Sequence, residues 1–143
     1  MSTSTNTLYK KISSLPVDDK NMLSLIHATR EGIKFPVFMT IARQSPFDLQ
    51  RWSSFLHLSL TTMLRYQKKN RRFDSPQSER IIQIALVYKK GLNVFGDKEK
   101  FYLWLETKNR ALGKTKPMEL LDNAFGITML TDELSRIEHG VLA

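Results

Sequence analysis

Apolar residues recur at three- and four-residue intervals along most of the chain, and the alternation of apolar and polar residues that is typical of strands is hard to find. This pattern predicts an all-α protein. The first 16 residues are rich in Ser and Thr and are expected to be a flexible N-terminus. The expected helices cover residues 18–29, 36–43, 46–57, 60–68, 76–95, 98–107, 117–126 and 127–139.

Capping residues set these bounds. Short polar side chains that accept hydrogen bonds from the first turn are expected at the N-caps, and proline follows two of them. The predicted N-caps are Ser45, Ser59, Ser75 and Asp97. Glycine is expected to end helices, so Gly126 should close the short helix 117–126 and Gly140 should break the last one.

Residues 46–72 have the layout of a helix-turn-helix. A capped helix is followed by a tight turn at His57 and Leu58, and Ser59 then caps a short second helix. The small side chain of Ser53 should let the two helices approach closely. Glycine is common in this kind of turn, but His57 is of a residue type that tolerates a positive φ.

The second helix of this motif should present a polar side to a ligand, because residues three, four and seven apart share one face. Its side chains are of the kinds that contact base edges and phosphates in DNA. The candidate DNA-binding residues are Ser59, Thr61, Thr62, Arg65, Lys68, Lys69, Arg71 and Arg72. An ordinary helical hairpin with a solvated basic end remains the alternative.

Charged residues are distributed unevenly along the chain. The formal net charge of the whole chain is +8. Residues 1–90 have 15 Lys and Arg and 6 Asp and Glu, a net charge of +9. Residues 91–143 have 7 Lys and Arg and 8 Asp and Glu, a net charge of −1. Residues 117–143 hold one basic and five acidic residues, a net of −4. A basic block and an acidic end suggest two partners, the first a polyanion. A basic surface that only keeps the protein soluble is the alternative.

Several classes of function are disfavoured. The chain has no Cys, its three His residues are scattered, and it has no glycine-rich phosphate loop, so we expect no enzyme, no metal site and no cofactor. The N-terminus lacks the apolar stretch of a signal peptide, and about 18 consecutive apolar residues occur nowhere. The expected location is the cytoplasm, with no membrane contact.

The last predicted helix, residues 127–139, is amphipathic. Its apolar stripe is formed by Ile127, Leu130, Leu134 and Ile137, with charged residues around it. This stripe could close the protein's own core or meet a partner, and opposite faces of one helix could do both.

Five short motifs follow one another in residues 93–143: Val94–Asp97, Trp104–Leu105, Asn109 with Ala111–Gly113, Pro117 with Glu119–Asp122, and Arg136–Val141. In kind and in order, these motifs resemble those of the toxin-binding domain of Xre/MbcA/ParS-type antitoxins. A weaker resemblance extends back into the predicted helix-turn-helix, where the family has an Xre-like DNA-binding fold. After the flexible segment 1–16, it implies a DNA-binding domain at 17–90 and a small helical toxin-binding domain at 91–143.

The resemblance also implies a function. Such an antitoxin pairs with a RES-domain toxin that consumes NAD, covers the entrance of the toxin's active site with its C-terminal domain, and dimerises on operator DNA to repress its own operon. An acidic C-terminal module would complement the basic pocket expected of an enzyme that handles NAD. The candidate toxin-binding residues are Leu130, Glu133, Leu134, Arg136, Ile137, Glu138, His139, Gly140 and Val141.

A second class of function stays open from the sequence. The chain would then be a stand-alone helix-turn-helix transcription regulator whose C-terminal module only dimerises. A gene for a RES-domain toxin next to this one would favour the antitoxin.

Overall fold

A computed structural model describes residues 19–140, and this part of the chain contains seven α-helices, two 3-10 helices and no strand. The predicted all-α class is therefore confirmed. The predicted flexible segment 1–16 and the candidate residue Val141 lie outside the described residues. The chain divides into two compact units between Ala85 and Leu86. This division falls inside one helix, α6, on which the predicted boundary between residues 90 and 91 also lies.

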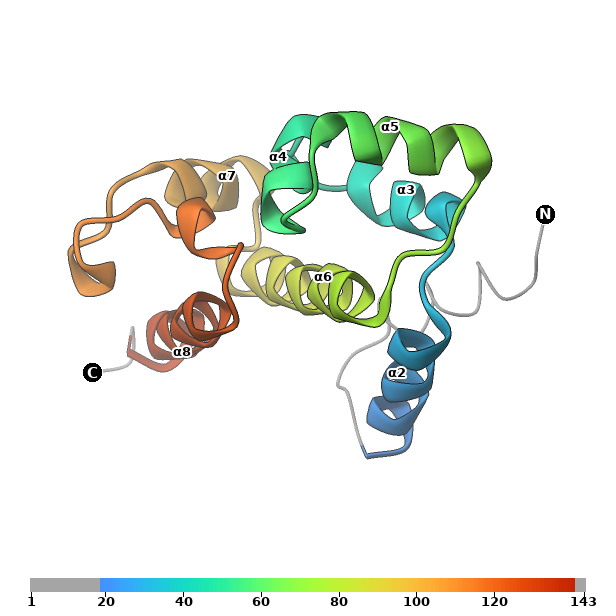
Figure 1. The fold of residues 1–143 in the computed structure, drawn as a ribbon. Helices are drawn as coiled ribbons and strands as arrows, with labels where there is room; N and C mark the ends of the chain where they lie inside the picture. The colour runs from blue at the N-terminus through green and yellow to red at the C-terminus, as the bar shows by residue number, and fades with distance from the viewer. Residues whose placement is uncertain (1–18, 141–143) are drawn as a thin grey trace. The chain divides into compact units, whose positions relative to one another are not determined.

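The N-terminal unit is built from α2 (Asp19–Glu31), α3 (Phe35–Arg43), α4 (Leu49–Phe55), α5 (Leu60–Lys69) and the first part of α6 (Ser75–Phe95) (Figure 1). Its core is a cluster of aromatic rings in edge-to-face and stacked contacts, with centroids 5.0–6.2 Å apart. Such contacts favour one packing over others, because the ring quadrupoles prefer particular angles. The rings belong to Phe35, Phe38, Phe47, Trp52, Phe55, Tyr66 and Phe73.

A buried hydroxyl joins the connection between α2 and α3 to α6. Ser78 is 0% exposed, accepts a hydrogen bond from the Ile33 backbone N–H at 2.9 Å, and donates one to the Phe73 carbonyl at 3.3 Å. Gly32 ends α2 with a φ of +89°, and a Cβ at that position would lie 2.5 Å from the Phe73 carbonyl oxygen. Only glycine therefore fits this junction.

The predicted N-cap at Ser45 is wrong. The helix α4 begins three residues later, and the side chain of Asp48 accepts the cap hydrogen bond from the Arg51 N–H at 2.8 Å. The Ser45 hydroxyl instead donates to the Ala42 carbonyl at 2.7 Å and accepts from Trp52 Nε1 at 3.1 Å. Ser45 thus bonds to the end of α3 and holds the buried indole of Trp52 in place. The local sequence pattern does not reveal the bond to Trp52, because it is made by a side chain seven residues away.

The predicted N-cap at Ser75 is wrong by one residue. The carbonyl of Asp74 already accepts a helical hydrogen bond from the Ser78 N–H at 2.9 Å, so Ser75 is the first residue of α6. The caps predicted at Ser59 and Asp97 are confirmed, since their side chains accept from the N–H groups of Thr62 and Glu99. Hydrogen bonds with Glu99 hold the pKa of the exposed Asp97 carboxyl below its usual value.

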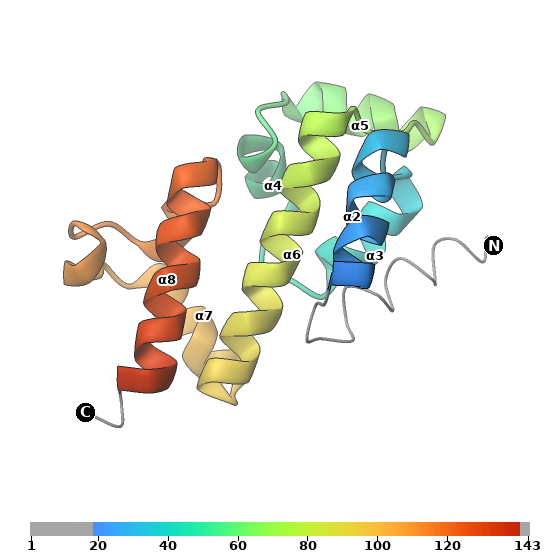
Figure 2. The same ribbon diagram turned by 90° about the horizontal axis from the view of Figure 1, so that it is seen from below.

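The C-terminal unit contains the rest of α6, then α7 (Lys98–Glu106), the 3-10 helices η1 (Arg110–Leu112) and η2 (Pro117–Leu120), and α8 (Ala124–Gly140) (Figure 2). Gly91 lets α6 and α7 approach, because a Cβ there would lie 2.1 Å from atoms of the Phe101 ring. Next to it, the hydroxyls of Tyr88 and Tyr102 are 2.5 Å apart, and burial together with this hydrogen bond raises the pKa of Tyr88.

The predicted helix 117–126 is wrong, and so is the break expected at Gly126. The segment stops at Leu120 as a short 3-10 helix, Asn123 caps the next helix, and α8 continues through Gly126. The described part of α8 ends at Gly140, so the break expected there stays a prediction. Gly126 is a packing residue, since a Cβ there would lie 2.3 Å from the Leu120 carbonyl oxygen. The missing side chain allows η2 to lie directly against α8.

Candidate DNA-binding and partner-binding sites

The helix-turn-helix predicted from the sequence is present as α4 and α5, which contact each other (Figure 1). Its turn holds His57 at a φ of +57°, the left-handed conformation that this residue type was expected to tolerate. The buried Ser53 offers its carbonyl to the Leu58 N–H at 2.9 Å, and Met63, on the inner side of α5, is 0% exposed. These contacts fix which side of α5 faces outward.

The outward side of α5 carries three of the candidate residues in the expected arrangement. Thr61, Arg65 and Lys68 are exposed and share one face through their spacing of four and three residues. Ser59 and Thr62 are engaged in the cap, where the Ser59 hydroxyl accepts from the Thr62 N–H at 3.0 Å and lies 2.9 Å from the Thr62 hydroxyl. Their first role here is to start the helix.

The basic end of α5 is organised by local contacts. Its left-handed C-cap, Asn70, turns the chain, and the guanidinium of Arg71 then lies 5.2 Å from the centre of the Tyr66 ring. Arg72 donates to the Gly32 carbonyl at 2.9 Å. The contact of Arg72 serves the N-terminal core, whereas Lys68 and Lys69 are exposed and better placed for phosphates.

In the C-terminal unit, the apolar stripe of α8 faces inward. Leu130 and Leu134 are both 0% exposed, and Ile127 is 6% exposed. As placed here, the two leucines hold α8 in its own unit and are not accessible to a partner. They can support a partner-binding surface only by positioning the helix that carries it.

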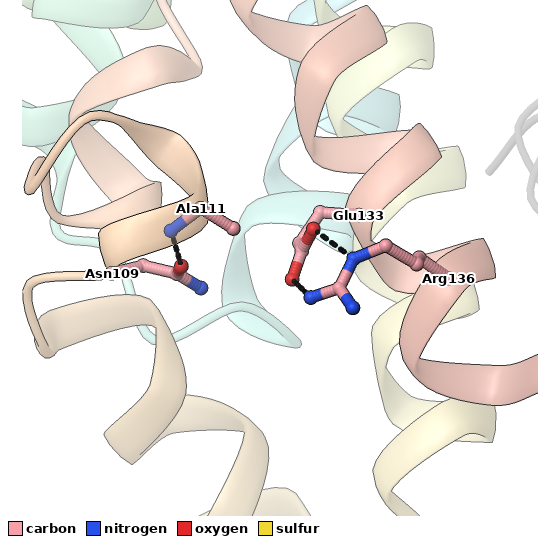
Figure 3. A network of polar contacts seen from close by, with 4 residues as sticks. All are labelled: Asn109, Ala111, Glu133 and Arg136. Atoms are coloured by element: carbon pink, nitrogen blue, oxygen red, sulfur yellow. Dashed lines mark hydrogen bonds and ion pairs between the residues drawn. The ribbon is translucent and has the colours of Figure 1, made fainter. Parts of the chain in front are cut away.

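One charged pair lies at the edge of this core. The carboxylate of Glu133, a residue only 8% exposed, receives two hydrogen bonds from the Arg136 guanidinium, at 2.9 and 2.5 Å (Figure 3). The bond to Glu133 raises the pKa of Arg136. Figure 3 also shows Asn109, whose side chain caps η1 by accepting from the Ala111 N–H at 2.8 Å. The 3-10 helix η1 is in contact with α8.

The remaining candidate residues at the end of α8 are more accessible. Ile137 is half-buried, while Glu138, His139 and Gly140 are exposed. The Nε2 atom of His139 lies 3.7 Å from the Glu138 carboxylate. The accessible candidates therefore form a mainly polar end to the helix.

Two exposed apolar residues on α8 were not among the candidates. Phe125 is 84% exposed and Met129 is 45% exposed. Their spacing of four residues, on the side opposite Leu130 and Leu134, was a signal that the sequence contained. The candidate set instead included residues of the apolar stripe, which the structure buries.

Within residues 19–140 there is no group of three or more His, Cys, Asp or Glu side chains that could hold a metal ion. No helix in the same range is both long enough and apolar enough to cross a membrane.

Two family models match the chain, one in each part. Residues 24–86 match the model described as the antitoxin Xre-like helix-turn-helix domain, and residues 90–140 match the antitoxin Xre/MbcA/ParS C-terminal toxin-binding domain. The first match contains α4 and α5, and the second contains α7 and α8.

Two relatives are named "Antitoxin Xre". The protein from Yersinia enterocolitica is 32% identical over 83 residues, which cover 57% of this chain and 56% of the relative. The protein from Photorhabdus laumondii is 28% identical over 104 residues, which cover 66% of this chain and 70% of the relative. The match thus spans little more than half the length of the Yersinia protein.

Proposed function

Because this chain belongs to the Xre/MbcA/ParS family of antitoxins, we propose that it is the antitoxin of a type II toxin-antitoxin system. Its C-terminal unit binds a toxin and blocks the entrance to the toxin's active site. Its helix-turn-helix binds operator DNA, as a homodimer, and represses the operon.

One observation carries this proposal. The two family matches, 24–86 and 90–140, follow each other in the order of a DNA-binding and a toxin-binding domain, and they fall on the two compact units of the fold. In a stand-alone regulator the C-terminal module would only dimerise and would not need to bind a toxin. A domain matching the toxin-binding model therefore favours the antitoxin over the regulator.

We further propose that the toxin is a RES-domain enzyme that consumes NAD. Charge supports this choice, since residues 117–143 carry a net charge of −4 and a pocket that holds an anionic dinucleotide is expected to be basic. Opposite potentials speed the encounter of two proteins and disfavour wrong partners.

Co-expression with the adjacent gene tests the function. The full chain is expected to restore growth and cellular NAD in cells that produce the toxin, whereas a chain that ends at Asn123, before α8, should restore neither. Growth arrest with an unchanged NAD level would reject the RES-type activity. An adjacent gene product that is harmless without this chain would reject the antitoxin role.

The DNA-binding role gives a separate prediction for Arg65. We expect Arg65→Ala to weaken operator binding by about 1–3 kcal/mol if the guanidinium contacts a base, or to lower the salt dependence by about one counterion if it contacts a phosphate. Titration of labelled operator DNA at several salt concentrations measures both quantities.

Arg110→Ala is the matched control, because it removes the same charge from an exposed position in the other unit. Operator binding that responds equally to the two substitutions would show that only net charge matters. The outward face of α5 would then have no specific role.

A further inference from the structure

The outward face of α8 begins with two large apolar side chains, Phe125 and Met129, that the described chain leaves 84% and 45% exposed. They are four residues apart, so they lie one turn apart on the same side of the helix. Moving a large apolar side chain out of water is favourable in free energy, and the exposed Phe125 does not gain this within its own unit. Burying this pair against a partner would therefore contribute favourable free energy to binding.

The structure holds this pair outward. The side chain of Asn123 accepts hydrogen bonds from the N–H groups of Phe125, at 2.8 Å, and Gly126, at 3.3 Å. Gly126 lies against the Leu120 carbonyl, where no Cβ fits, and the fully buried Leu130 and Leu134 fill the opposite side. Rotating α8 to bury Phe125 would expose these core residues, so the pair has no place inside its own unit.

The charge along the same face indicates the chemistry of the partner. Asp132 is exposed on this face, three residues after Met129, whereas the exposed Glu138 lies on the other side of the helix. The basic Arg136 is held by both oxygens of Glu133, which offsets its charge. After the apolar pair this face thus carries the exposed carboxylate of Asp132, and it is complementary to an apolar depression with Lys or Arg at its rim.

We propose that Phe125 and Met129 are the apolar anchor by which this antitoxin docks on its toxin, in an apolar depression beside the basic entrance of the active site. This inference rests on the proposed function and on the match of residues 90–140 to a toxin-binding domain. Aromatic residues in desolvated pockets dominate the affinity of many protein interfaces. The anchor residues differ from the nine toxin-binding candidates predicted from the sequence.

The test is the affinity of the full-length chain for the purified RES-domain toxin of its operon, measured by titration calorimetry. Phe125→Ala is expected to raise the Kd at least about tenfold, equal to about 1.4 kcal/mol. Met129→Ala should have a smaller effect, and the double substitution should exceed either one. The melting temperature of the free chain should stay unchanged, because both side chains are outside the core.

Leu23→Ala is the control, since Leu23 is a large apolar residue, 60% exposed, in the N-terminal unit. It should leave the Kd unchanged.

If the wild-type chain binds the toxin and the double variant binds equally well, the anchor is refuted while the proposed function stands. If the wild-type chain does not bind, both fail. If the double variant instead loses self-association in sedimentation without toxin, the face belongs to a second copy of the chain and the anchor is likewise refuted.

Discussion

Replacing Trp52 by alanine is expected to destabilise the N-terminal unit by about 3–5 kcal/mol and to abolish operator binding. The indole is 1% exposed, and its ring contacts Phe38, Phe47 and Phe55 at 5.2–6.2 Å between centroids. Its Nε1 also donates to Ser45. Such a loss is a large part of the roughly 5–15 kcal/mol by which domains are stable, so the surface of α5 would no longer be presented.

Urea denaturation followed by circular dichroism measures this loss. The chain has two tryptophans, and Trp104 lies half-buried in the C-terminal unit. In the Trp52→Ala variant, fluorescence therefore reports on the C-terminal unit alone, and its transition should shift less than the one seen by dichroism. The Trp104→Phe variant leaves Trp52 as the reporter of the other unit. A destabilisation below about 1 kcal/mol would contradict the packing described for Trp52.

Replacing Leu134 by alanine is expected to remove toxin neutralisation while operator binding remains. Leu134 is 0% exposed, and truncating a buried leucine costs about 2–5 kcal/mol through lost burial and the cavity left behind. The C-terminal unit would lose the position of α8, and with it the surface that the toxin is proposed to meet. Thermal melting, toxin affinity and operator affinity of the same variant separate these effects.

The comparison of Leu134→Ala with Phe125→Ala distinguishes a supporting residue from a contact residue. The first should lower the stability of the free chain and the second should not, although both weaken toxin binding. A Leu134→Ala variant with an unchanged melting temperature and reduced affinity would contradict the inward placement of Leu134. It would restore this residue to the surface predicted from the sequence.

The elements that the sequence predicted best are those whose signals are local. The cap at Ser59 and the turn at His57 were expected because a short polar side chain and a residue tolerant of positive φ act within a few positions. The prediction of a cap at Ser45 was wrong, because the Ser45 hydroxyl makes its hydrogen bonds with Ala42 and Trp52 instead. Nothing in the local pattern distinguishes this use of a serine from a cap.

The candidate sites show the same division. Spacing alone placed Thr61, Arg65 and Lys68 on one face of α5, and the structure shows that all three are exposed. On α8 the spacing correctly grouped Leu130 with Leu134, but it did not show whether that face met a partner or the unit's own core. Packing against the rest of the C-terminal unit turned it inward.

The sequence by itself determined the helical class, the helix-turn-helix and the charge difference between the two ends, because periodicity, capping and composition depend on neighbours along the chain. Only the tertiary structure decided which residues are accessible. Gly126 is an example: the sequence indicated a helix end, but the Leu120 carbonyl occupies the space of its missing side chain and leaves Phe125 in solvent. The physical reason is that burial depends on contacts between segments, and no local pattern contains them.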